Sequence, residues 1–498
     1  MRALLLGSSL LAFAACGGRG TLYTHALAPL PLVATSSALV HVVPTTSRAV
    51  VLAPGTTTPT ALRLSDGARL AQRIPHADAL VVLTGGPRHP TMDLVDLGAG
   101  AVEVFDLPGY FDQVTFSDDG RFGVFTYDAA STAGPLVARN LNEVALLTTG
   151  SRTISRLQLD TESLAPRGVL FAPAEANRQL VAVRLERGVA LFDALHPEVA
   201  PRRITLRPPG SAAETAVVEA LFSRDVRWLF LRATALDDVI AIELGPEVGA
   251  PVSASINFVS GGRGLADLEV APEGMSDAVL AAYSTSRELW LLDAHGIQDR
   301  AKKFSSTEAV SALTLLGGTK VLGWSPGAKG VVAWDVADGR AGTSVLDGAV
   351  GRPWLAPAMG KAMFFHPATT SGGASLTAVT LTEETNRLRL RLQAIQLARP
   401  MQACALDAAG QRLFFSVNGS PSVVTLELAT LQLAELPLDT GTTALFHLDE
   451  GDWLAATSGT TESTGDVTLW PAGEVDRAKV IRFSDYLFTQ DFDRAEAP

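Results

Sequence analysis

Residues 114–125 read Val-Thr-Phe-Ser-Asp-Asp-Gly-Arg-Phe-Gly-Val-Phe, and this stretch decides the fold. Apolar residues stand on both sides of a short acidic turn that ends in Gly120. Because Asp and Gly favour tight turns while Val and Phe favour strands, the stretch predicts two antiparallel strands joined by a hairpin. A second copy occupies residues 222–230, where Val226 takes the place of the glycine. Weaker copies begin at Phe171, Val270, Leu406 and Leu448.

The same pattern of short apolar runs and turn residues continues along most of the chain. Short apolar or alternating runs, such as residues 239–242 and 289–292, are broken by Gly, Pro, Asp, Asn and Ser. Runs this short predict strands, and the strict Leu/Arg alternation of residues 388–392 is typical of a half-buried strand. The strand–turn–strand unit recurs roughly every 40 to 55 residues, which is the period of four-stranded propeller blades.

We therefore predict an all-β protein, a β-propeller of four-stranded antiparallel blades over residues 38–488, followed by a tail at 489–498. About nine or ten candidate units can be marked, but single rings usually have four to eight blades. Eight blades are favoured within a range of about seven to ten, and two smaller propellers are the alternative. The stretch 76–107 lacks an obvious first strand. Residues 39–43 are expected to close the ring by pairing with the last blade near residues 467–470.

The turn sequence also carries a family resemblance. Phe116-Ser117-Asp118-Asp119-Gly120 resembles the Phe-Ser-Pro-Asp-Gly repeat of periplasmic and surface-layer β-propellers, with Asp118 where that family carries proline. The resemblance implies the propeller fold over most of residues 38–488. It does not imply one function, because propellers host both enzymes and inert scaffolds.

The N-terminal segment has the layout of a secretory signal. Met1-Arg2 supplies a basic start, residues 3–13 are apolar, and a small-residue stretch ends at Cys16. The run is shorter than the roughly 20 residues that cross a bilayer. It resembles the signal of bacterial lipoproteins, in which the cysteine is acylated and becomes the first residue. We expect a signal peptide at 1–15 and a lipidated Cys16 followed by a flexible tether at 16–37, while an ordinary secretory signal cut near Ala15 is the alternative.

Composition limits the possible partners. The chain has 498 residues, of which 47% are hydrophobic and 18% charged, which favours a packed protein. A net charge of −12 disfavours nucleic acid, because phosphate binding needs clustered Lys and Arg. With two cysteines, one of them Cys16, no disulfide framework is expected, and Cys404 lies in an apolar setting typical of a buried hydrophobe. Membrane attachment is expected through lipid alone.

None of the short sequence motifs for catalysis or metal binding is convincing in this chain. Residues 323–327 match Gly-x-Ser-x-Gly, but Pro326 has no N–H to donate to an oxyanion, so a hairpin turn is favoured. Three His-Pro pairs, at His89, His196 and His366, are expected in loops and as solvated side chains. Acidic pairs fit tight turns better than calcium loops, and the tryptophans are expected to pack between blades. No catalytic, metal-binding or cofactor-binding residue is predicted, and no cofactor.

Two functions remain. The first is a non-catalytic, lipid-anchored propeller of the bacterial cell envelope, on the outer membrane because Gly17 follows the cysteine, that binds an envelope protein or a glycan. A sensor or structural spacer is not separable from it by sequence. The second is a hydrolase or lactonase whose Asp, Glu or His side chains converge from separate blades. Polar groups with perturbed pKa values facing one opening of the ring would favour the second.

Overall fold

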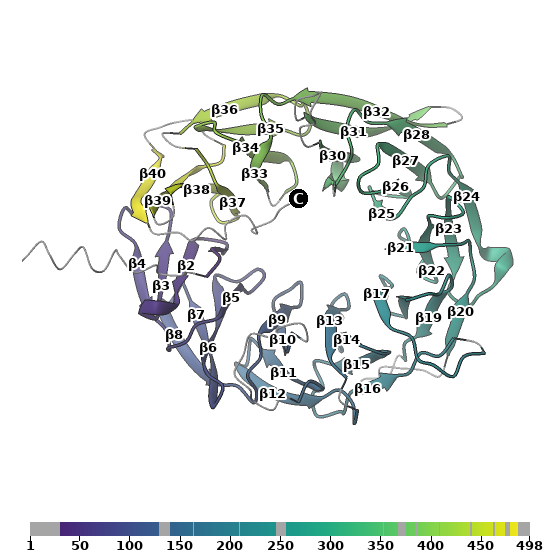
Figure 1. Cartoon of the computed structure of the whole chain (residues 1–498), viewed down its shortest axis with the longest axis horizontal. Helices are drawn as coiled ribbons and strands as arrows, with labels where there is room; N and C mark the ends of the chain where they lie inside the picture. Colours follow the sequence, from purple (N-terminus) through teal and green to yellow (C-terminus); the bar gives the residue numbers. More distant parts are fainter. Residues whose placement is uncertain are drawn as a thin grey trace, which may run out of the picture.

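The computed structural model describes residues 30–486, apart from residues 129–139, 163, 209, 246–254, 352, 367–374, 385–386, 408, 439–440, 462–463 and 474–478. Within this part of the chain, strands form ten four-stranded antiparallel sheets arranged in one ring (Figure 1). The β-propeller prediction is therefore confirmed. Among the described residues no helix is long and apolar enough to span a membrane.

Each blade is one uninterrupted segment of the chain. Blades 1 to 4 contain β1 (Val33–Ala34), β2 (Leu39–Val43), β3 (Arg48–Leu52), β4 (Thr60–Arg63); β5 (Leu70–Arg73), β6 (Ala79–Gly86), β7 (His89–Asp96), β8 (Ala101–Asp106); β9 (Gln113–Phe116), β10 (Phe122–Thr126), β11 (Glu143–Thr148), β12 (Thr153–Gln158); and β13 (Pro166–Phe171), β14 (Leu180–Leu185), β15 (Val189–Asp193), β16 (Arg202–Ile204). Blades 5 to 7 contain β17 (Val217–Phe222), β18 (Trp228–Ala233), β19 (Val239–Glu243), β20 (Ile256–Val259); β21 (Leu265–Val270), β22 (Ala278–Tyr283), β23 (Glu288–Asp293), β24 (Lys302–Ser305); and β25 (Ala312–Leu315), β26 (Lys320–Trp324), β27 (Gly330–Asp335), β28 (Ala341–Val345). Blades 8 to 10 contain β29 (Trp354–Ala356), β30 (Lys361–His366), β31 (Ser375–Glu384), β32 (Arg387–Gln396); β33 (Met401–Leu406), β34 (Arg412–Val417), β35 (Ser422–Glu427), β36 (Leu433–Pro437); and β37 (Ala444–Leu448), β38 (Trp453–Thr461), β39 (Thr464–Pro471), β40 (Ile481–Tyr486). In the described part of the chain, three short 3-10 helices lie in connections: η1 (Pro44–Thr46), η2 (Gln298–Arg300) and η3 (Pro357–Met359).

The blade count differs from the favoured number. The ring has ten blades in its described part, so the preference for eight is wrong, although ten lies within the predicted range. One reason is the first strand of blade 2. It is β5, whose sequence Leu-Ala-Gln-Arg is partly polar and carries no buried residue, so no apolar run marks it. The described strands form a single ring rather than the alternative of two smaller ones (Figure 1).

The order of strands within a blade positions the candidate site. In Figure 1 the labelled first strands, such as β5, β9, β13 and β17, lie nearest the centre of the ring, and the fourth strands lie at its perimeter. All six copies of the strand–turn–strand unit that the sequence marks are the first two strands of a blade. The unit is therefore the inner hairpin, and whatever its first strand exposes lines the inner rim.

Apolar packing between blades holds the ring together. Each of the ten blade-to-blade junctions has its own cluster of buried hydrophobic residues. Neighbouring residues of one strand serve two junctions: on β6, Val81 packs towards blade 3 and Val82 towards blade 1. Both faces of the middle strands are thus covered, which explains why many of them are continuous apolar runs instead of alternating ones.

The ring closes differently from the sequence prediction. Strand β2, predicted to pair with the last blade, pairs instead with β1 and β3 of its own blade, so that prediction is wrong. The first blade begins at β1, inside the segment expected as a tether. Blades 1 and 10 meet through a cluster that includes Leu39 and Leu469, and through a hydrogen bond from Glu450 N–H to Ser36 O (2.8 Å).

The turn that predicted the fold has a defined geometry. Ser117 Oγ accepts a hydrogen bond from Phe122 N–H (3.0 Å) and donates one to Asp119 Oδ1 (2.7 Å). Gly120 has a φ of +69°, and a Cβ there would lie 2.2 Å from Pro75 O in blade 2. Glycine is therefore required at this position, by its positive φ and by the close approach of the next blade.

Candidate binding site on the inner rim

A shared irregularity places acidic residues on the inner rim. The first strands of blades 4, 5, 6 and 9 each show a register shift near their start, at residues 166–168, 217–219, 265–267 and 401–403. Such bulges redirect the side chain that follows them. In blades 5 and 6 that residue is Glu219 or Asp267, whereas in blades 4 and 9 it is Gly168 or Ala403. Two carboxyl groups therefore occupy equivalent positions on adjacent inner strands.

Glu219 is held within its own blade. It lies opposite Arg232 on β18, whose Nε donates to Glu219 Oε2 at 2.8 Å. Both side chains are about three-quarters buried, with exposed fractions of 25% for Glu219 and 23% for Arg232. Glu219 also lies beside Asp267 in blade 6, close enough for its negative charge to raise the pKa of that carboxyl. The pair thus continues into the next blade.

The carboxyl group of Asp267 has a strongly raised pKa. Burial and, after it, the neighbouring Glu219 raise the pKa of Asp267 to about 7, against the N–H of Leu313 in blade 7, which donates to Asp267 Oδ2 at 2.6 Å. Arg232 also opposes this rise, but from the far side of Glu219. Near neutral pH, Asp267 is therefore partly protonated.

Glu269 stands two residues further along the same strand, on the same face as Asp267. Burial raises its pKa, while hydrogen bonds from the N–H groups of Val270 (2.8 Å) and Leu315 (3.3 Å) favour the charged form. Leu313 and Leu315 both lie on β25, so the carboxyl groups of blade 6 are bound by the backbone of blade 7. We call Glu219, Arg232, Asp267 and Glu269 the inner-rim cluster.

A cavity of about 380 Å³ adjoins this cluster. Asp267 and Glu269 form its polar side, and the rest of its wall comes from blade 7, from Pro353 and from β29, the first strand of blade 8. These lining residues are Ala312, Leu313, Thr314, Trp324, Pro326, Pro353 and Leu355. An apolar wall with a few polar groups on one side is the usual composition of a small-molecule site.

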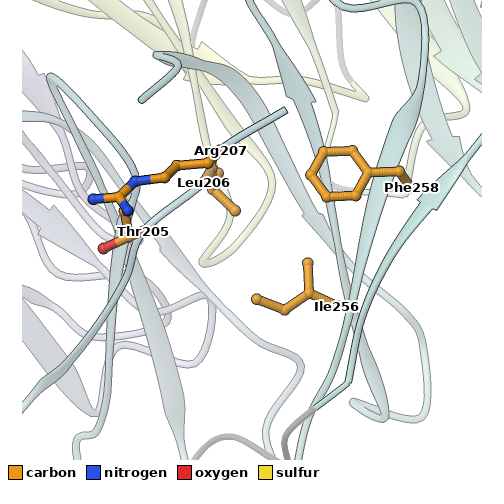
Figure 2. Close-up of a pocket in the computed structure, with 5 residues that line it drawn as sticks. All are labelled: Thr205, Leu206, Arg207, Ile256 and Phe258. Atoms are coloured by element: carbon orange, nitrogen blue, oxygen red, sulfur yellow. The ribbon is translucent and has the colours of Figure 1, made fainter. Parts of the chain in front are cut away.

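A second cavity lies at the perimeter, between blades 4 and 5. It measures about 320 Å³ and is lined by Thr205, Leu206, Arg207, Ile256 and Phe258 (Figure 2). In Figure 2 the apolar side chains of Ile256 and Phe258 face the segment that carries Arg207. That guanidinium forms an ion pair with Glu214 (3.6 Å). The perimeter cavity thus combines apolar side chains with one arginine, whereas the inner-rim cavity is bordered by two carboxyl groups.

The sequence motifs lie where the turn interpretation expects them. Ser325 follows β26 directly, and its Oγ donates to Ala309 O (2.7 Å), so residues 323–327 belong to a hairpin as predicted. The acidic pairs are also turn residues: Asp237 accepts from Gly264 N–H (2.8 Å) and Asp238 from Ser260 Oγ (2.7 Å).

Cys404 is 8% exposed in the core between blades 8 and 9, as predicted. Cys16 lies outside the described residues.

The three histidines do not converge. His89, His196 and His366 belong to blades 2, 4 and 8, and among the described residues no group of three or more His, Cys, Asp or Glu is placed to hold a metal ion. The expectation of a solvated loop is wrong for His366, which is 2% exposed on β30. Its ring nitrogens contact Ala349 O (3.0 Å) and Thr377 Oγ1 (2.8 Å), so its role is to fix local structure.

Sequence reasoning missed the inner-rim cluster. A usable signal existed in the repeat: Glu219 stands three residues before Phe222, and Asp267 three residues before Val270, at the matching place in two copies of the unit. Aligning the copies would have put both acids on one rim. The bulge that turns them towards each other has no sequence mark comparable to glycine in the turn.

Comparison with known proteins adds little beyond the architecture. No protein-family model matches the chain, and no curated protein matches it in sequence. Among solved structures it is similar to the dihydro-heme d1 dehydrogenase NirN in complex with DHE, with 13% identity, a TM-score of 0.43, and coverage of 84% of this chain and 79% of that one. The β-propeller domain of Myceliophteria thermophila Cps50 (Swd1) gives 12% identity, a TM-score of 0.30, and coverage of 79% and 96%. Kuenenia stuttgartiensis hydrazine synthase gives 13%, 0.31, and coverage of 65% and 96%.

Proposed function

We propose that this chain is a lipid-anchored β-propeller of the bacterial cell envelope that works as a binding scaffold without catalysing a reaction. The observation that carries the binding role is the inner rim of blades 5 to 7. There Asp267 and Glu269 accept hydrogen bonds from backbone N–H groups of the next blade and border a cavity with apolar walls. Carboxyl groups fixed in this way present a rigid surface to a ligand.

A partner surface on the perimeter supports the same proposal. On the long hairpin of β31 and β32, Leu388 and Leu390 pack into the core between blades 7 and 8, while Arg387, Arg389 and Arg391 are exposed on the opposite face. Glu384 binds Arg387 (2.6 Å) and Arg389 (3.0 Å). A row of guanidinium groups on a chain of net charge −12 suits an acidic surface of an envelope protein or an anionic glycan.

The anchor rests on the N-terminal residues 1–16, whose layout is that of a lipoprotein signal. The test is metabolic labelling with a radioactive fatty acid, followed by separation of membrane and soluble fractions. Wild-type protein should carry label and sediment with outer membranes, while a Cys16→Ala variant should lose the label and become soluble. Membrane retention of the unlabelled variant would contradict the anchor.

The scaffold role has its own test. Full-length protein, solubilised from envelopes in mild detergent, should retain an envelope protein or a glycan, and a variant with Arg387, Arg389 and Arg391 changed to Gln should retain less of it. Recovery of no partner above background would count against the scaffold.

One observation favours the alternative, a hydrolase or lactonase with its site at the mouth of the ring. Asp267, with a pKa of about 7, is suited to exchange protons with a substrate near neutral pH. An ester and lactone panel should then show turnover that Asp267→Asn removes, with a pH–rate inflection near pH 7. Turnover that is equal in the wild type and the variant would exclude this role.

A further inference from the structure

We infer that one face of blade 8 binds a linear acidic glycan, a chain of sugars that carries carboxylates along its length. This inference rests on the proposed binding role and names the class of partner for one surface. The surface is the side of β30, β31 and β32 that carries basic and hydroxyl side chains. We call it the basic face, and its members are Lys361, Thr380, Thr382, Arg387, Arg389 and Arg391.

Strand pairing places these side chains on one surface. Lys361 lies opposite Thr380, and Thr380 lies opposite Arg391, so these three form one row across the blade. Thr382 likewise lies opposite Arg389. Because residues two apart on a strand share a face, the arginines of β32 follow one another at intervals of about 7 Å. In Figure 1, β32 lies at the perimeter of the ring, where a long chain can reach it.

The positive charge on this face is not balanced by acids. Glu384 pairs with Arg387 (2.6 Å) and Arg389 (3.0 Å), whose side chains are 67% and 63% exposed. Within the described part of the chain, no acid pairs with Arg391. Burial and, after it, the positive charge of Arg391 lower the pKa of Lys361, and no acid opposes this shift. Four cations therefore share one carboxylate.

Another arginine on the perimeter shows the balanced case. Arg203 on β16 binds Asp160 (2.7 Å), Glu162 (3.0 Å) and Glu214 (2.5 Å), so the acids around it outnumber the cation. Such contacts hold the chain in place and leave no positive charge for a partner. The basic face has the opposite balance, on a chain whose net charge is −12. An anionic partner supplies the missing negative charge.

The unused donors of this face match carboxylates. A guanidinium presents five N–H groups in a planar fork and can bind a carboxylate through two of them. Lys361 Nζ donates to Leu428 O and to Ala429 O (2.8 Å) of blade 9, which leaves one of its three N–H groups. Because Thr380 lies between Lys361 and Arg391, a carboxylate above Thr380 stands between both cations.

The uncharged positions of this face select a sugar. Thr380 and Thr382 place hydroxyl groups beside the cations, and a hydroxyl can both donate to and accept from the hydroxyls of a sugar. The paired positions from Thr380 and Arg391 to Glu384 and Arg387 hold no aliphatic or aromatic side chain. Protein interfaces usually have an apolar or aromatic core, and membrane-binding surfaces insert apolar side chains. A polar, charged chain therefore suits this face better than a folded protein or a bilayer.

The test is isothermal titration calorimetry on the full chain carrying Cys16→Ala, with hexagalacturonate as the probe. This oligomer is longer than the line from Arg387 to Arg391, which spans roughly 13 Å. Its methyl ester keeps the sugars without the charge, and hexaglutamate keeps the charge without the sugars. Hexagalacturonate should bind with a Kd below about 1 mM, the methyl ester at least about tenfold more weakly, and hexaglutamate at least about fivefold more weakly.

Raising the salt concentration gives a second measurement on the same samples. An increase from about 50 mM to about 500 mM NaCl should weaken the binding of hexagalacturonate, because salt screens exposed charges. The weak binding of the uncharged methyl ester should change little.

Variants locate the site. Changing Arg389 and Arg391 together to Gln should weaken hexagalacturonate binding by about tenfold or more. The matched control changes Arg48 and Arg63 to Gln, since these exposed arginines lie opposite each other on the last two strands of blade 1, and it should bind like the parent. Thr380→Val removes a hydroxyl and should weaken hexagalacturonate by about fivefold without changing hexaglutamate binding. Thermal unfolding of each variant guards against misfolding.

Four results would overturn the inference. The first is no heat of binding for hexagalacturonate up to about 10 mM, and the second is equally tight binding of hexaglutamate. The third is an equal loss of affinity in the control that changes Arg48 and Arg63. The fourth is tighter binding to phosphatidylglycerol vesicles than to the oligomer, lost when Arg389 and Arg391 are changed, which would assign the face to an anionic membrane.

The titration uses purified protein without envelopes, so its outcome is separate from that of partner capture. Binding of hexagalacturonate with no partner recovered from envelopes would refute the scaffold and leave the glycan site in place. Capture of an envelope protein without any binding of hexagalacturonate would refute the glycan site and leave the scaffold in place.

Discussion

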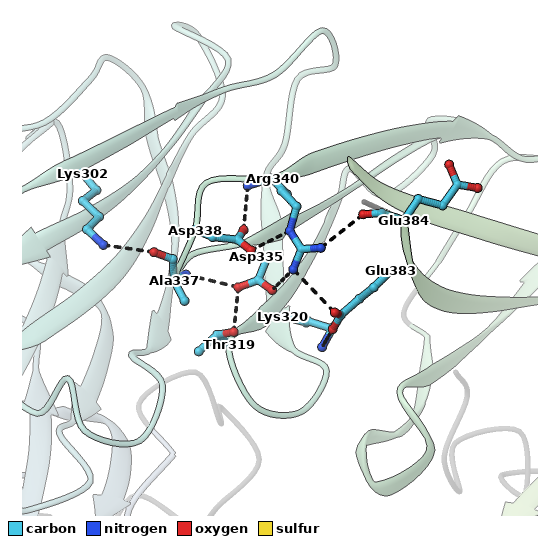
Figure 3. A network of polar contacts seen from close by, with 9 residues as sticks. All are labelled: Lys302, Thr319, Lys320, Asp335, Ala337, Asp338, Arg340, Glu383 and Glu384. Carbon is cyan, nitrogen blue, oxygen red and sulfur yellow. Dashed lines mark hydrogen bonds and ion pairs between the residues drawn. The ribbon is translucent and has the colours of Figure 1, made fainter. Parts of the chain in front are cut away.

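Two groups of acidic residues in this ring have pKa values shifted in opposite directions. The inner-rim cluster of blades 5 and 6 has three carboxyl groups and Arg232, and its Asp267 and Glu269 have raised pKa values. The junction cluster of blades 7 and 8, which comprises Lys320, Asp335, Asp338, Arg340 and Glu383, pairs its acids with cations (Figure 3). There the Arg340 backbone N–H lowers the pKa of Asp338, and Lys320 lowers that of Glu383.

The difference lies in what surrounds each acid. In the junction cluster, Arg340 reaches Asp335 (3.3 Å), Asp338 (2.5 Å) and Glu383 (3.6 Å), so one guanidinium joins β27 to the hairpin of β31 and β32 (Figure 3). These contacts are structural. In the inner-rim cluster the acids outnumber the cation and face a cavity. Identical residue types thus serve stability in one place and are available to a ligand in the other.

The largest expected effect is on the junction cluster. Asp335→Ala should lower the free energy of unfolding by about 3 kcal/mol, because Thr319 Oγ1 and the Ala337 N–H lose their acceptor and Arg340 loses a partner. Urea denaturation followed by tryptophan fluorescence measures it. Asp335→Asn should recover part of the loss, and equal values for Ala and Asn would show that the carboxylate charge and its acceptor positions do not matter.

Removing the cation from the inner-rim cluster should have the next largest effect. Arg232→Gln leaves Glu219 beside Asp267 without its ion-pair partner and should cost about 2 kcal/mol at pH 8. At pH 5 the cost should be smaller, since Asp267, whose pKa is about 7, is protonated there. If the cost is the same at both values, the coupling between Glu219 and Asp267 is absent.

Removing the raised acid should have a smaller effect of the opposite sign. The folded-state pKa of Asp267, about 7, lies above its unfolded value, so its contribution to stability is greatest at low pH and is lost as the pH rises to about 7. Asp267→Asn should therefore stabilise the protein by about 1 kcal/mol at pH 8 and leave it nearly unchanged at pH 4. Melting curves at the two pH values test this, and a variant that is less stable than the wild type at pH 8 contradicts it.

The smallest effect should come from an exposed acid of the junction cluster. The lowered pKa of Asp338 means that its contribution to stability is present above its unfolded pKa and is lost as the pH falls through its folded value. Asp338→Asn should lower the melting temperature slightly at pH 7, and the difference should vanish in acid. This pH trend is the reverse of that for Asp267→Asn, and equal trends would remove the distinction between the two clusters.

How far the sequence could predict these features depends on how locally they are encoded. The turn at Ser117–Gly120 involves neighbouring residues and one obligatory glycine, so strands, hairpins and the propeller class were all predictable from it. The first strand of blade 2 was missed because Leu70–Arg73 has no buried residue. The number of blades depends on how many of them pack around the central axis, and the sequence of a single blade does not determine that number.

The inner-rim cluster was unpredictable for a different reason. Asp267 meets Glu219 of one neighbouring blade and Leu313 of the other, and 46 residues separate Asp267 from Leu313. Only the closed ring brings these positions together, and a strand bulge then sets the direction of the side chains. The sequence named perturbed polar groups at one opening of the ring only as the feature that would favour a hydrolase, and it named no residue for them.

The closure of the ring has a consequence for how such a molecule can change. Because every sheet is built from consecutive strands and blades 1 and 10 share no strand, a whole blade can be duplicated or deleted without breaking the pairing inside any other. Gene rearrangements in steps of one blade would then yield rings of altered circumference from the same parts. In a ring whose last blade is completed by a strand from the N-terminus, a blade could not be added or lost at that position without breaking a sheet. Here the first and last blades meet through an apolar cluster, as the other neighbouring blades do.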